Sequence, residues 1–183
     1  RGGGTALLHR QVTEADADGL WTLQTSVFPN NRASLALHHS AGYVTVGVRI
    51  ALEVLSEPGP VVLPVPAYDP QHGLAGITGR EQWDLPVDPD GDSYARDLDA
   101  LDDLFAKGAR TLLLTQPHNP GGHVHTRAEL EAVRDVVARH GGRVVSDEIH
   151  GPLVLPGAEH VPYLSLEGTS DHAVAVVAAS KAF

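Results

Sequence analysis

The sequence predicts an α/β fold, with a mostly parallel sheet flanked by helices. Two observations lead to this class. Short, uninterrupted apolar segments recur along the chain, and from residue 35 onward amphipathic helical patterns alternate with them. Continuous apolar strands are typical of a sheet whose two faces are both covered, and strands that alternate with helices are typical of parallel pairing.

The first half of this alternation contains five predicted elements. The spacing predicts a short strand at residues 35–39 and a helix over 44–55, followed by strands at 61–65 and 82–87 and a helix over 98–105. Apolar residues recur every three or four positions in the two helices. The two longer strands contain prolines, which favour strand ends.

The second half has clearer boundaries. Residues 111–114 form a continuous apolar strand, and Thr126 and Glu129 then form a capping box that begins a helix. That helix is expected to run to about Arg139, with Gly141 suited to the left-handed position just past its end. Two further strands are predicted at residues 143–146 and 173–177.

The chain is expected to contain two parts. Residues 1–34 show a gapped helical pattern and are predicted to form an N-terminal helical segment, whereas residues 35–183 form the main domain. The chain begins with Arg1 rather than Met and stops two residues after Lys181, where a strand end normally leads into a helix. We therefore expect a partial sequence.

Composition narrows the class of protein. The 183 residues are 42% hydrophobic, enough for one sizeable core, and the net charge of −10 argues against a nucleic-acid partner, which needs clustered Lys and Arg. There is no cysteine, no signal-peptide pattern and no apolar run long enough for a membrane helix. We expect a cytoplasmic protein.

Three polar residues follow predicted strands: Asn119, Asp147 and Lys181. Ligands of parallel α/β sheets bind beyond the carboxyl ends of the strands, so these three side chains are candidates for one site. Each also has a simpler interpretation. Asn119 could simply be part of a turn, Asp147 could cap a helix, and Lys181 could be a surface lysine.

The surrounding motifs favour a functional site. They read Pro-His-Asn-Pro-Gly-Gly at residues 117–122, Ser-Asp-Glu-Ile-His at 146–150 and Ala-Ala-Ser-Lys at 178–181. Their order resembles the cofactor site of fold-type I pyridoxal phosphate (PLP) enzymes. The residues of these motifs are most similar to those of the cystathionine β-lyase-like branch of the class I/II aminotransferase family. The resemblance covers roughly residues 35–183 and implies the N-terminal part of the PLP-binding large domain.

This resemblance assigns a role to each motif residue. It implies that Lys181 forms the Schiff base with PLP and that Asp147 faces the pyridine nitrogen. Asn119 would bond to the phenolic oxygen of the cofactor, and Tyr68 would stack on its ring. His150 stands where many aminotransferases carry Tyr, and His is usual at this place in the β-lyase-like branch.

The phosphate site is only partly recognisable. The resemblance implies contacts from Gly42, Tyr43 and Ser180, and the first two precede a predicted helix whose N-terminal amides can bind an anion. The family commonly has Ser or Thr three residues before the lysine, but this chain has Ala178. The family's second phosphate-binding Arg and its substrate-carboxylate Arg lie beyond the matched region.

The resemblance implies a PLP-dependent carbon–sulfur β-lyase that acts on cystathionine or another cysteine S-conjugate and is a homodimer when full length. An aminotransferase on a small amino-acid substrate is the first alternative, and a non-catalytic truncated fragment is the second. The 183-residue chain alone is expected to be inactive.

Two other clusters resemble metal sites and are interpreted as turns or solvated surface. His123 and His125 share one face of an extended segment, but no Cys or paired carboxylate completes a zinc set. Asp88, Asp90 and Asp92 imitate the start of an EF-hand loop without its glycine and final Glu in place. We predict no metal site.

Overall fold

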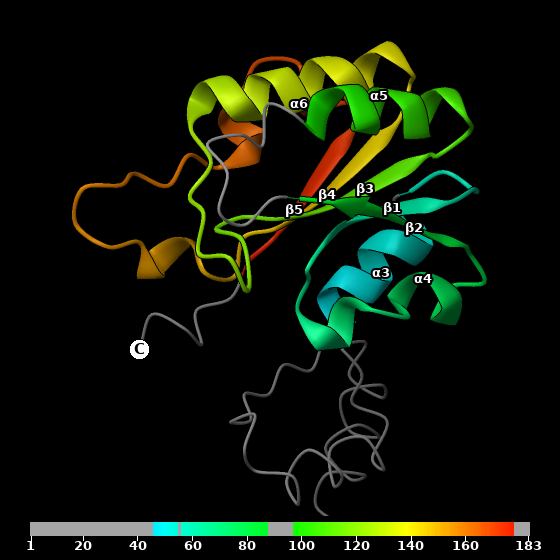
Figure 1. Cartoon of the computed structure of the whole chain (residues 1–183), viewed down its shortest axis with the longest axis horizontal. Coiled ribbons are helices and arrows are strands. Elements are labelled where there is room, and N and C mark those ends of the chain that lie inside the picture. Colours follow the sequence, from blue (N-terminus) through cyan, green and yellow to red (C-terminus); the bar gives the residue numbers. More distant parts are fainter. Residues whose placement is uncertain (1–45, 55, 88–96, 178–183) are drawn as a thin grey trace, which may run out of the picture. The chain divides into compact units, whose positions relative to one another are not determined.

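The computed structural model describes residues 46–54, 56–87 and 97–177, and from Ile50 onward these belong to one compact unit (Figure 1). The unit is built on a five-stranded sheet in the order β2-β1-β3-β4-β5, and every strand pair is parallel. The strands are β1 (Val61–Val65), β2 (Gln82–Pro86), β3 (Thr111–Thr115), β4 (Arg143–Asp147) and β5 (Ala173–Val176).

Helices lie on both faces of this sheet. Figure 1 shows α5 and α6 on one face and α4 on the other, together with the part of α3 that follows Ile50. The helices are α3 (Val46–Val54), α4 (Leu74–Ile77), α5 (Asp97–Ala106) and α6 (Arg127–Arg139), and three short 3₁₀ turns are η1 (Asp69–Gln71), η3 (Gly151–Leu153) and η4 (Tyr163–Ser165). No helix in the described ranges is long and apolar enough to cross a membrane.

The boundaries of α6 follow from its sequence. The Thr126 hydroxyl accepts a hydrogen bond from the Glu129 amide at 3.3 Å, and the Glu129 carboxylate accepts one from the Thr126 amide at 2.6 Å. At the other end Gly141 adopts φ of 61°, a left-handed conformation that glycine accepts without strain. The predicted capping box and the predicted helix end are both confirmed.

The larger core lies between the sheet and the pair α5 and α6. Strand side chains alternate between faces, so every second residue of a strand contributes to this core. Its buried strand residues are Val62, Leu85, Leu112, Leu114 and Val144, which pack with Leu101, Phe105, Leu130, Val133, Val136 and Val137 of the helices. The intervening strand residues Val61, Leu63, Leu113 and Val145 are also buried, on the opposite face.

The predicted α/β class and the described strands and long helices are confirmed, with two differences. The central strands β1, β3 and β4 are buried on both faces, but β2 and β5 are only partly buried because each has one neighbouring strand among the described residues. The sequence pattern also missed α4 and the 3₁₀ turns, which are too short to show a period. The predicted strand at 35–39 and the segment 1–34 lie outside the described residues.

Candidate functional site

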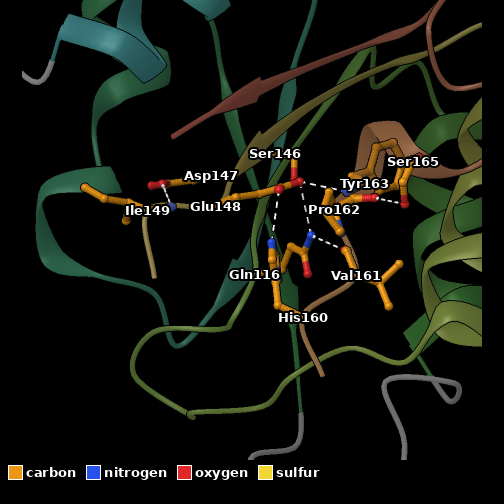
Figure 2. A network of polar contacts seen from close by, with 10 residues as sticks. All are labelled: Gln116, Ser146, Asp147, Glu148, Ile149, His160, Val161, Pro162, Tyr163 and Ser165. Carbon is orange, nitrogen blue, oxygen red and sulfur yellow. Dashed lines mark hydrogen bonds and ion pairs between the residues drawn. The ribbon is translucent and has the colours of Figure 1, made fainter. Parts of the chain in front are cut away.

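The polar residues at the carboxyl ends of β3 and β4 form two groups on opposite sides of the sheet. Thr115 and Asp147 are register partners at the last position of their strands. Their successors, Gln116 and Glu148, point to the other side because side chains alternate along an extended chain. Asp147 therefore lies on the side of α4, and Glu148 lies on the side of α5 and α6. Figure 2 shows these two neighbouring carboxylates pointing in opposite directions.

Asp147 is half-buried and both of its carboxylate oxygens accept hydrogen bonds. Oδ2 accepts one from Gln71 Nε2 at 2.9 Å, and Oδ1 accepts a longer one from the Ile149 amide at 3.4 Å. Burial raises the pKa of the Asp147 carboxyl, while the bonds from Ile149 and Gln71 and the nearby His150 oppose this rise. The site thus holds a carboxylate in a partly dry environment with a small set of defined donors.

Gln71 is itself fixed by Thr115, and the three residues Gln71, Thr115 and Asp147 are called the Gln71 cluster below. The Gln71 side chain is 3% exposed although it lies on the short turn η1. Its Nε2 lies 2.8 Å from Thr115 Oγ1, which donates to Gln71 Oε1 at 3.0 Å. A segment that follows β1 is therefore linked to the ends of both β3 and β4.

Glu148 is the centre of the second group, the Glu148 network, drawn in Figure 2. The side chain is 3% exposed, and its Oε1 accepts hydrogen bonds from Gln116 Nε2 at 3.1 Å, Ser146 Oγ at 2.8 Å and the Tyr163 amide at 2.8 Å. Oε2 lies 3.2 Å from His160 Nε2. This network joins the ends of β3 and β4 to the segment that leads into η4, so it fixes the strand end on which Asp147 stands.

Asn119 lies in a tight turn beyond β3. The His118 amide donates to the His123 carbonyl at 2.8 Å, and the Gly122 amide donates to the His118 carbonyl at 2.8 Å. Gly121 passes so close to His118 that an added Cβ would stand 2.8 Å from Nδ1 of that ring. Asn119 is half-buried, and its side-chain amide makes no hydrogen bond within the described ranges. The turn therefore presents an amide that can bind a ligand.

Tyr68 and His150 flank the Gln71 cluster in sequence. Tyr68 is 41% exposed and directly precedes η1, and its carbonyl accepts a hydrogen bond from the Gln71 amide at 2.8 Å. His150 is half-buried and directly precedes η3, with its carbonyl accepting from the Leu153 amide at 2.9 Å. An aromatic ring and an imidazole are thus held in the segments that follow β1 and β4.

The topology brings four predicted site residues to the carboxyl-terminal end of the parallel sheet. Tyr68 follows β1, Asn119 follows β3, and Asp147 ends β4 with His150 just beyond; these three strands are neighbours in the sheet. The predicted residues Gly42, Tyr43, Ser180 and Lys181, together with Ala178, lie outside the described residues. The position of Lys181 relative to Asp147 stays a prediction.

Sequence reasoning missed Gln71, Thr115 and the Glu148 network. One signal was present, because Thr115, Gln116, Asp147 and Glu148 are polar residues directly at the ends of apolar strands. Gln71 had no comparable signal. It is a polar residue in a loop, and its burial depends on the register of two strands distant in sequence.

The prediction that His123 and His125 occupy turns or solvated surface is wrong for His125. Its ring is fully buried, 4.8 Å from the His123 ring in an edge-on contact, while His123 Nε2 lies 3.0 Å from Glu129 Oε1. Burial lowers the pKa of His125 to about 3, so this ring is neutral. No group of His, Asp or Glu in the described ranges converges as a metal site, and Asp88, Asp90 and Asp92 lie outside those ranges.

Comparison with known proteins identifies the family of this chain. A model of the family "Aminotransferase class I and II" matches residues 39–183. The cystathionine beta-lyase PatB of Bacillus subtilis is 35% identical over 147 residues, which are 79% of this chain and 38% of that protein. The chain thus spans little more than a third of the length of the curated relatives it matches.

Solved structures give the same result. Cystalysin from Treponema denticola, whose crystal structure contains a pyridoxal 5'-phosphate cofactor, is 30% identical with a TM-score of 0.67 over 74% of this chain and 35% of that chain. The N-succinyldiaminopimelate aminotransferase of Mycobacterium tuberculosis is 25% identical with a TM-score of 0.68 over 97% of this chain and 50% of that chain. The family model covers most of the sequence and the fold agrees, so this chain belongs to the class I and II aminotransferase family.

Proposed function

We propose that the full-length protein containing this chain is a PLP-dependent carbon–sulfur β-lyase that cleaves cystathionine or another cysteine S-conjugate. The observation that carries the proposal is the Asp147 carboxylate, held at the carboxyl end of β4 by Gln71 and Ile149. Asn119 follows β3, the neighbour of β4, and Tyr68 follows β1, the next strand along the sheet. Because the chain spans about a third of its relatives, the activity is proposed for the full-length protein.

The residues present fit a pyridine cofactor. PLP supplies an electron sink for the bond-breaking step when it is bound. Asp147 offers a carboxylate to hold a proton on the ring nitrogen, and the Asn119 amide, which has no partner in the described part of the chain, offers a donor to the ring oxygen. Tyr68 offers an exposed ring for stacking, and His150 a further polar group. Gly42, Tyr43 and Ser180 are proposed to bind the phosphate.

Lys181 is proposed to perform the proton transfers. Its amine would hold PLP covalently in the resting enzyme and, once free, would remove the proton from Cα of the substrate. The bond from Cβ to sulfur breaks and the sulfur leaves as a thiolate. Hydrolysis of the remaining three-carbon unit with one water gives pyruvate and ammonia, so the reaction requires no external oxidant or reductant.

Two features favour elimination over transamination. The cystathionine beta-lyase PatB of Bacillus subtilis is 35% identical over 147 residues, and the probable N-succinyldiaminopimelate aminotransferase of Mycobacterium tuberculosis is slightly less similar, 32% identical over 145 residues. His150 is also the residue type that the resemblance associates with the β-lyase-like branch. Aminotransferase activity stays the second candidate because the aminotransferase structure covers 97% of this chain with the same fold.

The test compares the two lysines of this chain in the full-length protein. With Lys181→Ala we expect loss of the borohydride-reducible bond to PLP and of pyruvate release from cystathionine, whereas Lys107→Ala at an exposed position should retain both. Mass spectrometry of reduced, digested protein locates the modified lysine. A reducible bond that persists in Lys181→Ala contradicts the assignment of Lys181. Amino-group transfer to a 2-oxo acid without pyruvate release replaces the lyase with the aminotransferase.

The non-catalytic alternative is decided by the same measurement. If the unmodified full-length protein neither binds PLP nor turns over a cysteine conjugate or an amino acid, the enzymatic proposal fails, and the fold is retained without the activity.

A further inference from the structure

We propose that Gln71 is the positioning residue of this site, which fixes the Asp147 carboxylate in orientation and keeps it in its ionised form. The inference deepens the proposed function, because Asp147 is the group proposed to hold the proton of the cofactor ring. Gln71 belongs to none of the three motifs from which the site was predicted.

The geometry of the Gln71 cluster gives the amide a defined direction. An ionised carboxylate only accepts hydrogen bonds, so the nitrogen of the Gln71 amide must face Asp147, and it does so at 2.9 Å from Oδ2. The amide oxygen then accepts from the Thr115 hydroxyl at 3.0 Å. Gln71 and Thr115 are 3% and 5% exposed, so water does not compete for these bonds.

The other restraint on Asp147 is weaker. Oδ1 accepts a bond from the Ile149 amide at 3.4 Å, at the long end of the range for N–H···O bonds. That amide belongs to the segment after β4 and cannot stop the carboxylate from turning about its Cβ–Cγ bond. The shorter bond from Gln71 restrains the other oxygen, so together the two donors define the plane of the carboxylate.

The hydrogen bond from Gln71 to Asp147 also favours the ionised form of the carboxyl group. Burial raises the pKa of the Asp147 carboxyl, which works against an acid that has to stay ionised beside a protonated ring nitrogen. Among the described residues the charged or titratable groups acting on Asp147 are Glu148, which raises its pKa, and His150, which lowers it. The Ile149 amide and then Gln71 are the uncharged donors that lower the pKa by bonding to the ionised form, and Gln71 is the one of these whose donor lies on a side chain and can be removed by substitution.

Gln71 also couples two parts of the site. It lies three residues after Tyr68, and the backbone amide of Gln71 donates a hydrogen bond to the Tyr68 carbonyl at 2.8 Å. The turn that carries the proposed stacking ring is thereby connected to the carboxylate proposed to face the ring nitrogen. A side-chain substitution at residue 71 leaves this backbone bond in place and removes the bond to Asp147, so the acid–base behaviour of Asp147 reports the side-chain bond.

The experiment uses the full-length protein with Gln71→Met, which keeps the length of the side chain and removes its donor, and Thr115→Val, which removes the anchor of the amide. Gln82→Met is the matched control, because Gln82 Nε2 donates to Asp84 Oδ1 at 2.7 Å on the exposed edge of the sheet. The first readout is the Asp147 carboxyl titration followed by ¹³C NMR in cofactor-free protein. The second is PLP affinity as a function of pH.

In Gln71→Met we expect the Asp147 titration, and the pH below which PLP affinity falls, to move upward by about 1 pH unit, equivalent to about a tenfold gain in proton affinity. Thr115→Val should shift both in the same direction by less, and Gln82→Met should shift neither. Thr115→Val carries the test if Gln71→Met does not fold.

An unchanged Asp147 titration in the folded variants overturns the inference, as does a loss of PLP affinity by the same factor at every pH. Failure to bind PLP at all refutes the proposed function, while the NMR titration still decides the role of Gln71.

Discussion

Asp147 and Glu148 are adjacent carboxylates that point to opposite sides of the sheet and have entirely different partners (Figure 2). Asp147 contacts Gln71 on the side of α4, and Glu148 contacts Gln116, Ser146 and Tyr163 on the side of α5 and α6. Strand alternation separates them, so two like charges in sequence do not share one pocket. Glu148 fixes the strand end from one side, and Asp147, the proposed partner of the cofactor ring, lies on the other.

Replacing Asp147 with Asn should lower turnover of the full-length enzyme by orders of magnitude while PLP stays bound, because an uncharged amide cannot hold the ring proton. The charge-assisted bond that is lost is worth a few kcal/mol in the transition state. Steady-state kinetics and the absorbance of bound PLP measure the two effects separately. Near-normal turnover would mean that Asp147 is only a structural cap.

The same substitution should raise stability at neutral pH. Burial raises the pKa of Asp147 in the folded protein above its unfolded value of 3.8, so the folded state binds this proton more tightly. The stability associated with Asp147 is therefore greatest below pH 3.8 and is lost as the pH rises through the folded pKa. Urea denaturation of cofactor-free protein should show Asp147→Asn more stable than the parent at pH 7 and no such gain near pH 3. A gain of equal size at both values would refute this account.

Glu148→Ala should destabilise the protein strongly, because it leaves the Tyr163 amide and the Ser146 hydroxyl without this acceptor, and Gln116 Nε2 with the Val161 carbonyl alone. We expect a loss of about 3 kcal/mol in the free energy of unfolding. Glu148→Gln keeps one acceptor oxygen and should lose about 1 kcal/mol. Glu167→Ala, at an exposed position, is the control. Equal effects of Glu148→Ala and Glu167→Ala in denaturation experiments would mean that the network contributes nothing.

The sequence predicted the sheet, with candidate site residues at the carboxyl ends of its strands, because strands β1, β3 and β4 are largely apolar. It also predicted the start of α6, because Thr126 and Glu129 form a capping box there. It predicted Asp147 and Asn119 as site candidates through motifs. It could not identify Gln71, since that role arises from the register of Thr115 with Asp147 and from a turn that contains no periodic signal. The burial of His125 was missed for a similar reason, because the tertiary packing of the loop determines it.

Gly142→Ala should reduce stability although alanine is ordinarily the better residue in regular structure. A Cβ at position 142 would lie 2.3 Å from Cε1 of Phe105 and 3.0 Å from Cγ1 of Val137, both in the core between sheet and helices. Overpacking of this kind costs about 1–3 kcal/mol. In the matched variant Gly76→Ala, the added methyl in α4 meets no atom within 4 Å, and the protein should gain up to about 1 kcal/mol. Thermal denaturation of the two variants should show shifts of opposite sign, and shifts of the same sign would contradict the close packing at Gly142.

His125 should make the protein sensitive to acid. Burial lowers its pKa from 6.5 to about 3, so the folded state keeps the ring neutral while the unfolded chain takes up a proton below pH 6.5. The stability it contributes is complete above pH 6.5 and is lost as the pH falls toward about 3, at up to about 1.4 kcal/mol per pH unit. His125→Leu should flatten the dependence of the free energy of unfolding on pH across this window, whereas His72→Leu, at an exposed position, should leave the slope unchanged. An equally steep acid dependence in His125→Leu and the parent would assign the loss of stability to other groups.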